Sequence, residues 1–287
     1  MNNVLRTLIY GEQVSLTLAD TTAIVQEGIK RHHLSVASAK IYGKAISAMT
    51  FMSACLKEET GEISLSMKGD GEMGEIGVSG NRKLNLRGYI LNTNITDEFI
   101  QNEPLCLGEN GALTIIRDDG YNRPFVGSCA FSENGGVDEA FEEYFRISEQ
   151  LPTRLSTIVK CNEKGECVFA GVAVLQPLPF AEENILKAVA DVDLDALLAT
   201  VEEKGVEICA KEHFAGNIND EQVWETRKAQ YQCNCSREYL LGVLASLGEA
   251  QMRQIIAEDG ELRAHCHYCN TDYVFGEADA DILFSKK

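Results

Sequence analysis

Four cysteines near the end of the chain have the residue type and the spacing of a metal site. They form two close pairs, Cys233-Asn-Cys235 and Cys266-His-Tyr-Cys269, with 30 residues between the pairs. If the intervening segment is helical and brings the pairs together, they supply four sulfur ligands for a tetrahedral ion. Thiolates in that arrangement favour zinc, and the spacings differ from those usual for iron–sulfur clusters. His265 and His267 could compete as ligands, but four cysteines already close a structural zinc site.

The spacing of the first pair indicates a second property. Structural zinc sites usually use two to four residues between cysteines, whereas thiols one residue apart can close on each other once zinc leaves. The tail 231–287 has 57 residues and therefore little core of its own. Zinc contributes about 10–16 kcal/mol of apparent binding free energy in small peptides, more than such a tail can hold without metal. Oxidation of the thiols would eject zinc and unfold the tail, so the site can act as a redox switch.

Two other motifs resemble functional sites but are better explained as structure. Gly69–Gly74 matches the G-x-G-x-x-G pattern, yet a dinucleotide site needs a helix after the glycines, and Ile76 and Val78 alternate as in a strand. We interpret this segment as a turn between strands. His32-His33 ends a predicted helix without metal-ligand spacing nearby, and no Gly-x-Ser-x-Gly elbow indicates a Ser-His-Asp triad. The sequence thus predicts no catalytic residues, no cofactor besides zinc and no enzyme.

The other six cysteines are scattered. Cytosolic thiols are held reduced, and free cysteines are often buried, so these six are expected to be small buried hydrophobes without disulfides. Cys161 and Cys167 flank a turn signal at Asn162–Gly165 and are expected to face each other across a hairpin. The six are Cys55, Cys106, Cys129, Cys161, Cys167 and Cys209.

Composition and charge exclude several classes of protein. The chain has 287 residues, 45% apolar and 24% charged, the balance of a soluble globular protein. With 26 basic and 44 acidic residues, its net charge of −18 disfavours nucleic acid and acidic membrane surfaces as partners. No apolar run reaches the roughly 18–20 residues of a spanning helix, and the N-terminus lacks the pattern of a signal peptide. A cytoplasmic location is expected.

Three parts follow from the patterning along the chain. Residues 1–180 mix strands with period-two alternation, such as Ile63–Met67, and helices, such as Ile41–Cys55, without regular βαβ units. Residues 181–230 carry 5 basic and 12 acidic side chains with helical apolar spacing at Leu194–Val201, which predicts a charged helical linker. Residues 231–287 hold the four clustered cysteines. The expected fold is α+β, with a large N-terminal domain, a helical linker and a small zinc-binding domain.

Motifs along nearly the whole chain resemble the heat shock protein 33 family of redox-regulated molecular chaperones. The most specific are Tyr231–Glu238 and His265–Phe275, which contain the clustered cysteines. The other matching segments, in chain order, are Lys68–Gly71, Arg87–Tyr89, Gly111–Ile115 with Asp118, Tyr144-Phe145 and Ser148–Thr153.

That resemblance implies an ATP-independent holdase that is inactive while reduced and zinc-bound. It implies that Cys233, Cys235, Cys266 and Cys269 bind zinc and that oxidation joins Cys233 to Cys235 and Cys266 to Cys269. Loss of zinc would unfold the tail and linker, so that apolar surface binds unfolding client proteins, usually in a homodimer. The six additional cysteines and the acidity of the linker depart from the family pattern, and the extra thiols leave alternative disulfides open.

The residues fit two other functions less well. A thiol oxidoreductase would need an exposed C-x-x-C at a helix N-terminus in a thioredoxin-like setting, which is missing around Cys266. A zinc-ribbon nucleic-acid binder would need a basic surface, but the tail holds five basic residues against nine acidic ones.

Overall fold

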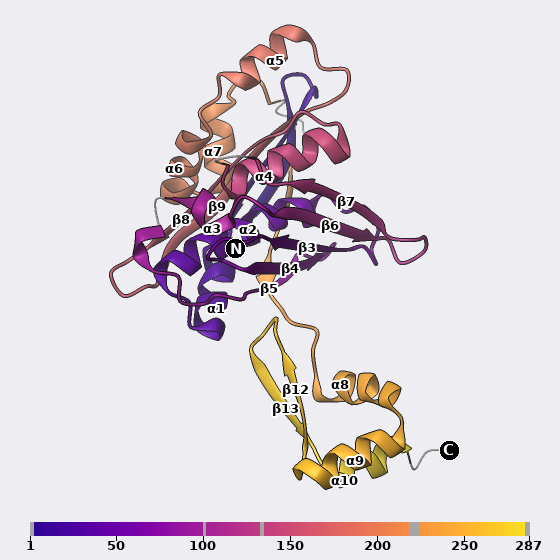
Figure 1. The fold of residues 1–287 in the computed structure, drawn as a ribbon. Helices are drawn as coiled ribbons and strands as arrows, with labels where there is room; N and C mark the ends of the chain where they lie inside the picture. The colour runs from indigo at the N-terminus through magenta and orange to yellow at the C-terminus, as the bar shows by residue number, and fades with distance from the viewer. Residues whose placement is uncertain (1–2, 100–101, 133–134, 219–223, 285–287) are drawn as a thin grey trace. The chain divides into compact units, whose positions relative to one another are not determined.

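The computed structural model describes residues 3–99, 102–132, 135–218 and 224–284. The chain divides into two compact units, Met1–Gln232 and Cys233–Lys287. Strands and helices occur in both. The α+β class expected from the sequence is therefore confirmed (Figure 1). The division into 1–180, 181–230 and 231–287 stays a prediction, although the described part of 181–230 packs within the first unit.

Two sheets and a central helix make up the first unit. The five-stranded sheet has the order β10-β1-β2-β9-β8, and the six-stranded sheet has the order β11-β5-β4-β3-β6-β7. The strands of the first sheet are β1 (Val4–Ile9), β2 (Val14–Asp20), β8 (Arg154–Cys161), β9 (Cys167–Pro177) and β10 (Glu225–Arg227). The strands of the second are β3 (Glu62–Lys68), β4 (Glu75–Asn81), β5 (Asn85–Ile90), β6 (Ala112–Asp118), β7 (Phe125–Ala130) and β11 (Gln230–Tyr231).

Helices fill the space between the sheets and cover their faces. They are α1 (Thr22–His32), α2 (Val36–Ala54), α3 (Glu103–Leu107), α4 (Val137–Tyr144), α5 (Glu183–Ala190), α6 (Leu194–Lys204) and α7 (Val206–His213), with single turns at Asp97–Phe99 and Phe145–Glu149. Helix α2 contacts β8 and β9 of one sheet and β4 and β5 of the other. It is buried on nearly every side, as expected of a helix with apolar or small residues all round.

The segment Gly69–Gly74 is the turn of a hairpin. Strands β3 and β4 pair antiparallel on either side of it, and the amide of Gly69 donates to the carbonyl of Gly74 at 3.1 Å. Because a strand and not a helix follows the glycines, the interpretation as a turn is confirmed.

Strand β9 is buried on both faces of the five-stranded sheet. Val172 and Val174 face the core around α2, while Ala173 and Leu175 face a second cluster beneath α6 and α7. This explains why residues 168–175 form an uninterrupted apolar run in the sequence.

The helices of the segment 181–230 cover the outer face of that sheet (Figure 1). Leu197 and Leu198 of α6 are fully buried there, together with Cys209 and Ala210 of α7. From the sheet side, Leu5, Leu16 and Leu18 complete the cluster. Two short amphipathic helices therefore share one apolar interface with the sheet.

Polar side chains on one face of β8 hold the same helices. Arg154 donates to the carbonyls of Val189 and Val192, at the end of α5, at 2.6 and 2.7 Å. Ser156 donates to Asp195 of α6 at 2.8 Å, and Lys160 forms an ion pair with Glu202. These three residues lie on the same face of β8. That face contacts the end of α5 and both ends of α6.

The chain between the linker helices and Cys233 is attached to both sheets. Strand β10 pairs antiparallel with β1, and β11 pairs parallel with β5. Arg227 donates to the carbonyl of Ala54 at 2.7 Å, at the end of α2, and the amide of Gln232 donates to Leu86 at 2.8 Å. The residue that directly precedes Cys233 is thus hydrogen-bonded to the first unit.

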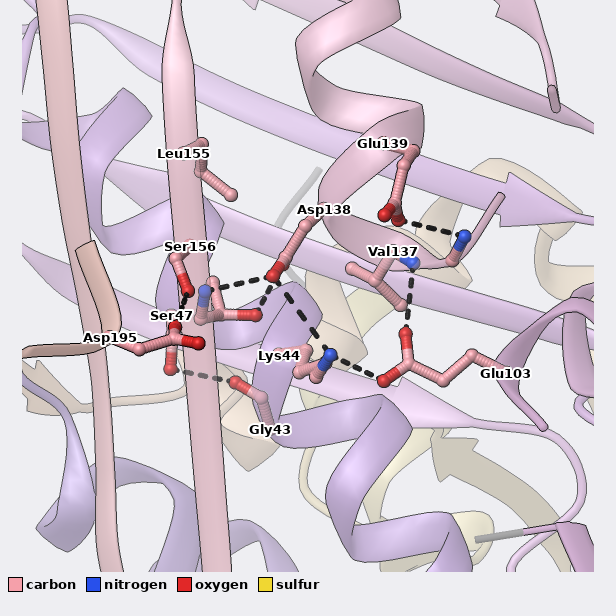
Figure 2. A network of polar contacts seen from close by, with 12 residues as sticks. Gly43, Lys44, Ser47, Glu103, Val137, Asp138, Glu139, Leu155, Ser156 and Asp195 are labelled. Carbon is pink, nitrogen blue, oxygen red and sulfur yellow. Dashed lines mark hydrogen bonds and ion pairs between the residues drawn. The ribbon is translucent and has the colours of Figure 1, made fainter. Parts of the chain in front are cut away.

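A partly buried polar network joins α2, α3, α4 and β8 (Figure 2). Asp138, in the first turn of α4, accepts hydrogen bonds from the amide and hydroxyl of Thr157 and lies 3.9 Å from the ammonium of Lys44. Lys44 also pairs with Glu103, which accepts a hydrogen bond from the amide of Val137 at 3.2 Å. Burial raises the pKa of Asp138 to about 6, although Lys44 and Thr157 act to lower it.

This raised pKa predicts a pH dependence of stability. The folded chain holds the Asp138 proton more tightly than the unfolded chain, in which the pKa of aspartate is about 3.9. The resulting stabilisation is complete below about pH 4 and is lost as the pH rises through about 6. The free energy of unfolding of Asp138→Asn, measured by urea denaturation, should therefore fall less than that of the unchanged protein across this range. A difference between the two proteins that stays constant from pH 4 to 6.5 would contradict this expectation.

Candidate metal centre

The second unit consists of helices and one β-hairpin. Its core holds five buried residues, Met252, Ile256, Leu262, Phe275 and Ala280. The elements are α8 (Arg237–Leu244), a single turn at Ala245–Leu247, α9 (Glu249–Asp259), β12 (Leu262–Cys266), β13 (Thr271–Phe275) and α10 (Glu277–Phe284). The helical segment expected between the cysteine pairs is therefore present.

The four clustered cysteines come together at one end of this unit. Cys233 and Cys235 lie in the extended chain before α8, Cys266 is the last residue of β12, and Cys269 lies in the turn between β12 and β13. Their sulfur atoms all lie within 4.8 Å of one another. The sulfurs of Cys235 and Cys269 are 3.1 Å apart, and those of Cys233 and Cys266 are 3.7 Å apart.

The four sulfur atoms of Cys233, Cys235, Cys266 and Cys269, called the cage below, are spaced to fit a tetrahedral ion. At a zinc–sulfur distance of about 2.3 Å, ligand sulfurs at tetrahedral angles lie about 3.8 Å from one another. The separations of 3.1 and 3.7 Å, with all four sulfurs within 4.8 Å, are close to that value. Four sulfur donors also match the preference of zinc for thiolate ligands. The group can thus hold a metal ion without rearrangement of the backbone.

Arg237 connects the first cysteine pair to the hairpin. Ser236 caps α8 by accepting a hydrogen bond from the amide of Tyr239 at 3.1 Å, which starts the helix directly after Cys235. Arg237 then donates to the carbonyl of Val274 at 2.6 Å and binds both carboxylate oxygens of Asp279, at 2.7 and 2.8 Å. Its guanidinium also lies 4.7 Å from the ring centre of Phe275. These contacts position Cys233 and Cys235 opposite the second pair.

The four thiols are electrostatically unequal. Burial acts to raise the pKa of Cys235, but hydrogen bonds from Tyr273 and from the neighbouring cysteines outweigh it and lower this pKa to about 7. Burial raises the pKa of Cys233 and, more strongly, that of Cys269. The hydroxyl of Tyr273, 3.3 Å from the sulfur of Cys235, favours the thiolate form of this cysteine. The surroundings thus help to ionise Cys235 and oppose the ionisation of Cys233 and Cys269.

The two neighbouring histidines have other contacts. The Nδ1 atom of His265 lies 2.7 Å from a carboxylate oxygen of Asp272, its partner across the β12–β13 hairpin. The ring of His267 stacks edge-on against that of His265, with centres 5.1 Å apart. The structure therefore groups the four cysteines, and the histidines lie beside the cage.

Comparison with known proteins decides the family. The family model described as Hsp33 protein matches residues 2–276. The chain belongs to the Hsp33 family. This Hsp33 family member is 30% identical over 284 residues to a 33 kDa chaperonin of Bacillus cytotoxicus, an alignment that covers 96% of each chain. It is also 30% identical over 291 residues to a 33 kDa chaperonin of Bacillus mycoides, covering 99% of this chain and 98% of the relative.

A crystal structure supports the fold of this Hsp33 family member. The 33 kDa chaperonin of Thermotoga maritima, a heat shock protein 33 homolog, superimposes with a TM-score of 0.84 at 22% identity. The match covers 99% of this chain and 98% of that one.

Several residues that shape this site were not singled out in the sequence. Arg237 and Asp279 are 42 residues apart, and only folding shows that they meet. In the first unit, Arg154, Ser156 and Lys160 share one face of β8 with Ile158, and this partial period-two pattern is a signal for the face that contacts the linker helices. Among the scattered cysteines, the burial expectation is confirmed for Cys106, Cys129, Cys167 and Cys209, whereas Cys55 and Cys161 are only half-buried.

Proposed function

We propose that this protein is a redox-regulated, ATP-independent chaperone that binds unfolding proteins after its four clustered cysteines are oxidised. Membership of the Hsp33 family and the name chaperonin given to its relatives support a chaperone role. The observation that carries the redox part is the cage of Cys233, Cys235, Cys266 and Cys269 in a unit whose described residues form a core of five buried apolar side chains. We further propose that it acts in the cytoplasm as a non-enzymatic protein.

In the reduced protein the four cysteines would hold one zinc ion. Bound zinc supplies folding free energy, about 10–16 kcal/mol in zinc-binding peptides, which the small core of this unit lacks. Arg237 and Tyr273 hold the thiols in place and favour the ionised sulfur of Cys235. The stability of residues 233–287 would then depend on the ionised, reduced state of these cysteines.

Oxidation would remove the ligands. Each pair of thiolates would give two electrons to one hydroperoxide, which takes up two protons from the solvent; one S–S bond forms, the O–O bond breaks, and two waters leave, or one water and one alcohol from an alkyl hydroperoxide. We propose the pairs Cys233–Cys235 and Cys266–Cys269. Sulfur distances of 3.1 and 3.7 Å join the two pairs to each other, and all four sulfurs lie within 4.8 Å of one another. Once the metal has left, the short loops favour disulfides between sequence neighbours.

Unfolding of the second unit would loosen the linker. Strand β11 and the amide of Gln232 hold the chain next to Cys233 on the first unit. Unfolding of the second unit would loosen this attachment and, through it, the linker helices. Release of α6 and α7 would uncover the apolar sheet face of Leu5, Leu16 and Leu18. Apolar surface beyond roughly a few hundred Å² is typical of protein-binding sites, and we propose unfolded clients and a second copy of the chain as partners.

The remaining partners follow from the surface and the motifs. A net charge of −18 argues against nucleic acid and membranes as partners. In the part of the chain that the structure describes, no helix is both long and apolar enough to cross a bilayer.

Oxidation of the protein with hydrogen peroxide tests this proposal. Addition of hydrogen peroxide to the reduced, zinc-loaded protein should release about one equivalent of zinc, detected with a chromogenic chelator. Amide hydrogen exchange should accelerate together in residues 233–284 and 183–213, whereas the strands around α2 should stay protected. Zinc release without faster exchange at residues 183–213 would contradict coupling of the linker to the metal site.

A further inference from the structure

A second pair of cysteines lies at the tip of the β8–β9 hairpin, in the first unit. Cys161 and Cys167 are cross-strand partners in the antiparallel register, on the turn side of a register shift between Lys160 and Cys161. Both side chains pack against the same core, which surrounds α2: Cys167 is 8% exposed and Cys161 is half-buried at its edge. The two sulfur atoms therefore project from the same face of the sheet.

The backbone places this pair in a non-hydrogen-bonded position. The amide of Cys167 points away from β8 and donates to the side-chain oxygen of Gln26 on α1, at 2.6 Å. The next pair toward the turn is hydrogen-bonded, since the amide of Asn162 donates to the carbonyl of Glu166 at 2.9 Å. In non-hydrogen-bonded antiparallel pairs the Cα atoms lie about 4.5 Å apart, within the range of about 4.4–6.8 Å that disulfides span.

The turn between the two cysteines is fixed by its own hydrogen bonds. The side-chain oxygen of Asn162 accepts from the amides of Lys164 and Glu166, at 2.9 and 3.0 Å. Gly165 has φ +77°, a conformation that suits glycine, and its amide donates to the carbonyl of Asn162 at 2.9 Å. Cys161 and Cys167 are consequently held opposite each other before any bond joins them.

We infer that Cys161 and Cys167 form a second redox site, a cross-strand disulfide made under hydroperoxide stress independently of the metal centre. The half-buried thiol of Cys161 attacks the peroxide, the O–O bond breaks, and Cys161 becomes a sulfenic acid as one water leaves. The sulfur of Cys167 then attacks Cys161, the S–O bond breaks, and a second water leaves. Two thiols and one hydrogen peroxide thus give one disulfide and two waters, with two electrons passing from sulfur to oxygen.

The environment makes this a slow reaction. Burial, assisted by the neighbouring Cys161, raises the pKa of Cys167 to about 12, and burial also raises the pKa of Cys161, which Lys40 acts to lower. Since the thiolate is the reactive form, the bond should form over prolonged exposure rather than in a brief pulse. Once formed, it would close the tip of the hairpin whose other face holds α6.

Tryptic mapping tests this site in the full-length protein. Trypsin cuts after Lys160 and Lys164, so Cys161 and Cys167 fall on separate peptides, 161–164 and 165–187. After prolonged hydrogen peroxide treatment, alkylation of free thiols and digestion without reductant, these peptides should appear as one species lighter than their sum by two hydrogens. A reductant should separate them.

Matched variants make the outcome decisive. In Cys161→Ser the peptide 165–187 should be recovered alone and alkylated. Cys129, which lies opposite Leu113 in the register, and Cys106, which lies in the helix α3, should stay alkylated throughout. The variant should still bind zinc, so failure here is distinguishable from failure of the proposed metal centre. Recovery of both peptides singly and alkylated, or of Cys161 linked to another cysteine, would overturn the inference.

Discussion

Replacement of Cys233, Cys235, Cys266 and Cys269 by serine should abolish zinc binding and unfold residues 233–284 while the two sheets and α2 of the first unit stay folded. The serine hydroxyl is a poor zinc ligand, and loss of zinc removes about 10–16 kcal/mol of apparent binding free energy. The five-residue core of this unit cannot replace that contribution. The zinc content should fall from about one equivalent to none, and amide protection should disappear in residues 233–284 and fall in residues 183–213, while the strands around α2 stay protected.

Cys161→Ser is the matched control, because Cys161 is a half-buried cysteine of the first unit, outside the cage. This variant should retain the full zinc content and amide protection of residues 233–284. Zinc bound by the quadruple variant at the level of the unchanged protein would refute the assignment of all four ligands.

Leu197→Ala should make the reduced protein bind clients without any oxidant. Leu197 is fully buried between α6 and the five-stranded sheet, and truncation of a buried leucine typically costs about 2–5 kcal/mol. Leu197 is one of nine linker residues buried in this cluster, so its truncation weakens the interface that keeps the helices on the sheet. Amide exchange in residues 194–213 should rise, and the reduced variant should slow the aggregation of a heat-denatured client.

Ile208→Ala provides the comparison for Leu197. Ile208 lies on α7, but its side chain is 46% exposed, so its truncation should leave the linker in place. If Leu197→Ala accelerates exchange in the linker and yet the reduced variant gives no protection to the client, the covered sheet face is not the client-binding surface.

The parts of the site that the sequence predicts are those encoded over short distances. The cysteine pairs are visible because one or two residues separate their members, and β3 is visible because Ile63, Leu65 and Met67 alternate on its buried face. Strand β9 shows no alternation, since its two faces meet two different cores. A continuous apolar run does not show which side chains of the strand face which core. The sheet face that the linker helices cover could therefore not be predicted from the sequence.

The packing of the linker and the frame of the metal centre depend on distant residues. The apolar spacing at Leu194–Val201 predicts one narrow stripe, but the structure adds Val206, Cys209 and Ala210 from α7 to the same interface. Likewise, the ion pair of Arg237 with Asp279 joins helices 42 residues apart. A single sequence gives no signal for such pairings, because either charge is equally compatible with an exposed helix surface.

Light scattering of a heat-denatured client protein, with reduced and peroxide-oxidised protein compared side by side and without ATP, tests the central claim most directly. The account predicts that the reduced, zinc-loaded protein leaves aggregation unchanged, that the oxidised protein suppresses it, and that a thiol reductant present during peroxide treatment prevents this activation. Equal protection of the client by reduced and oxidised protein would contradict redox regulation, even with the zinc site confirmed.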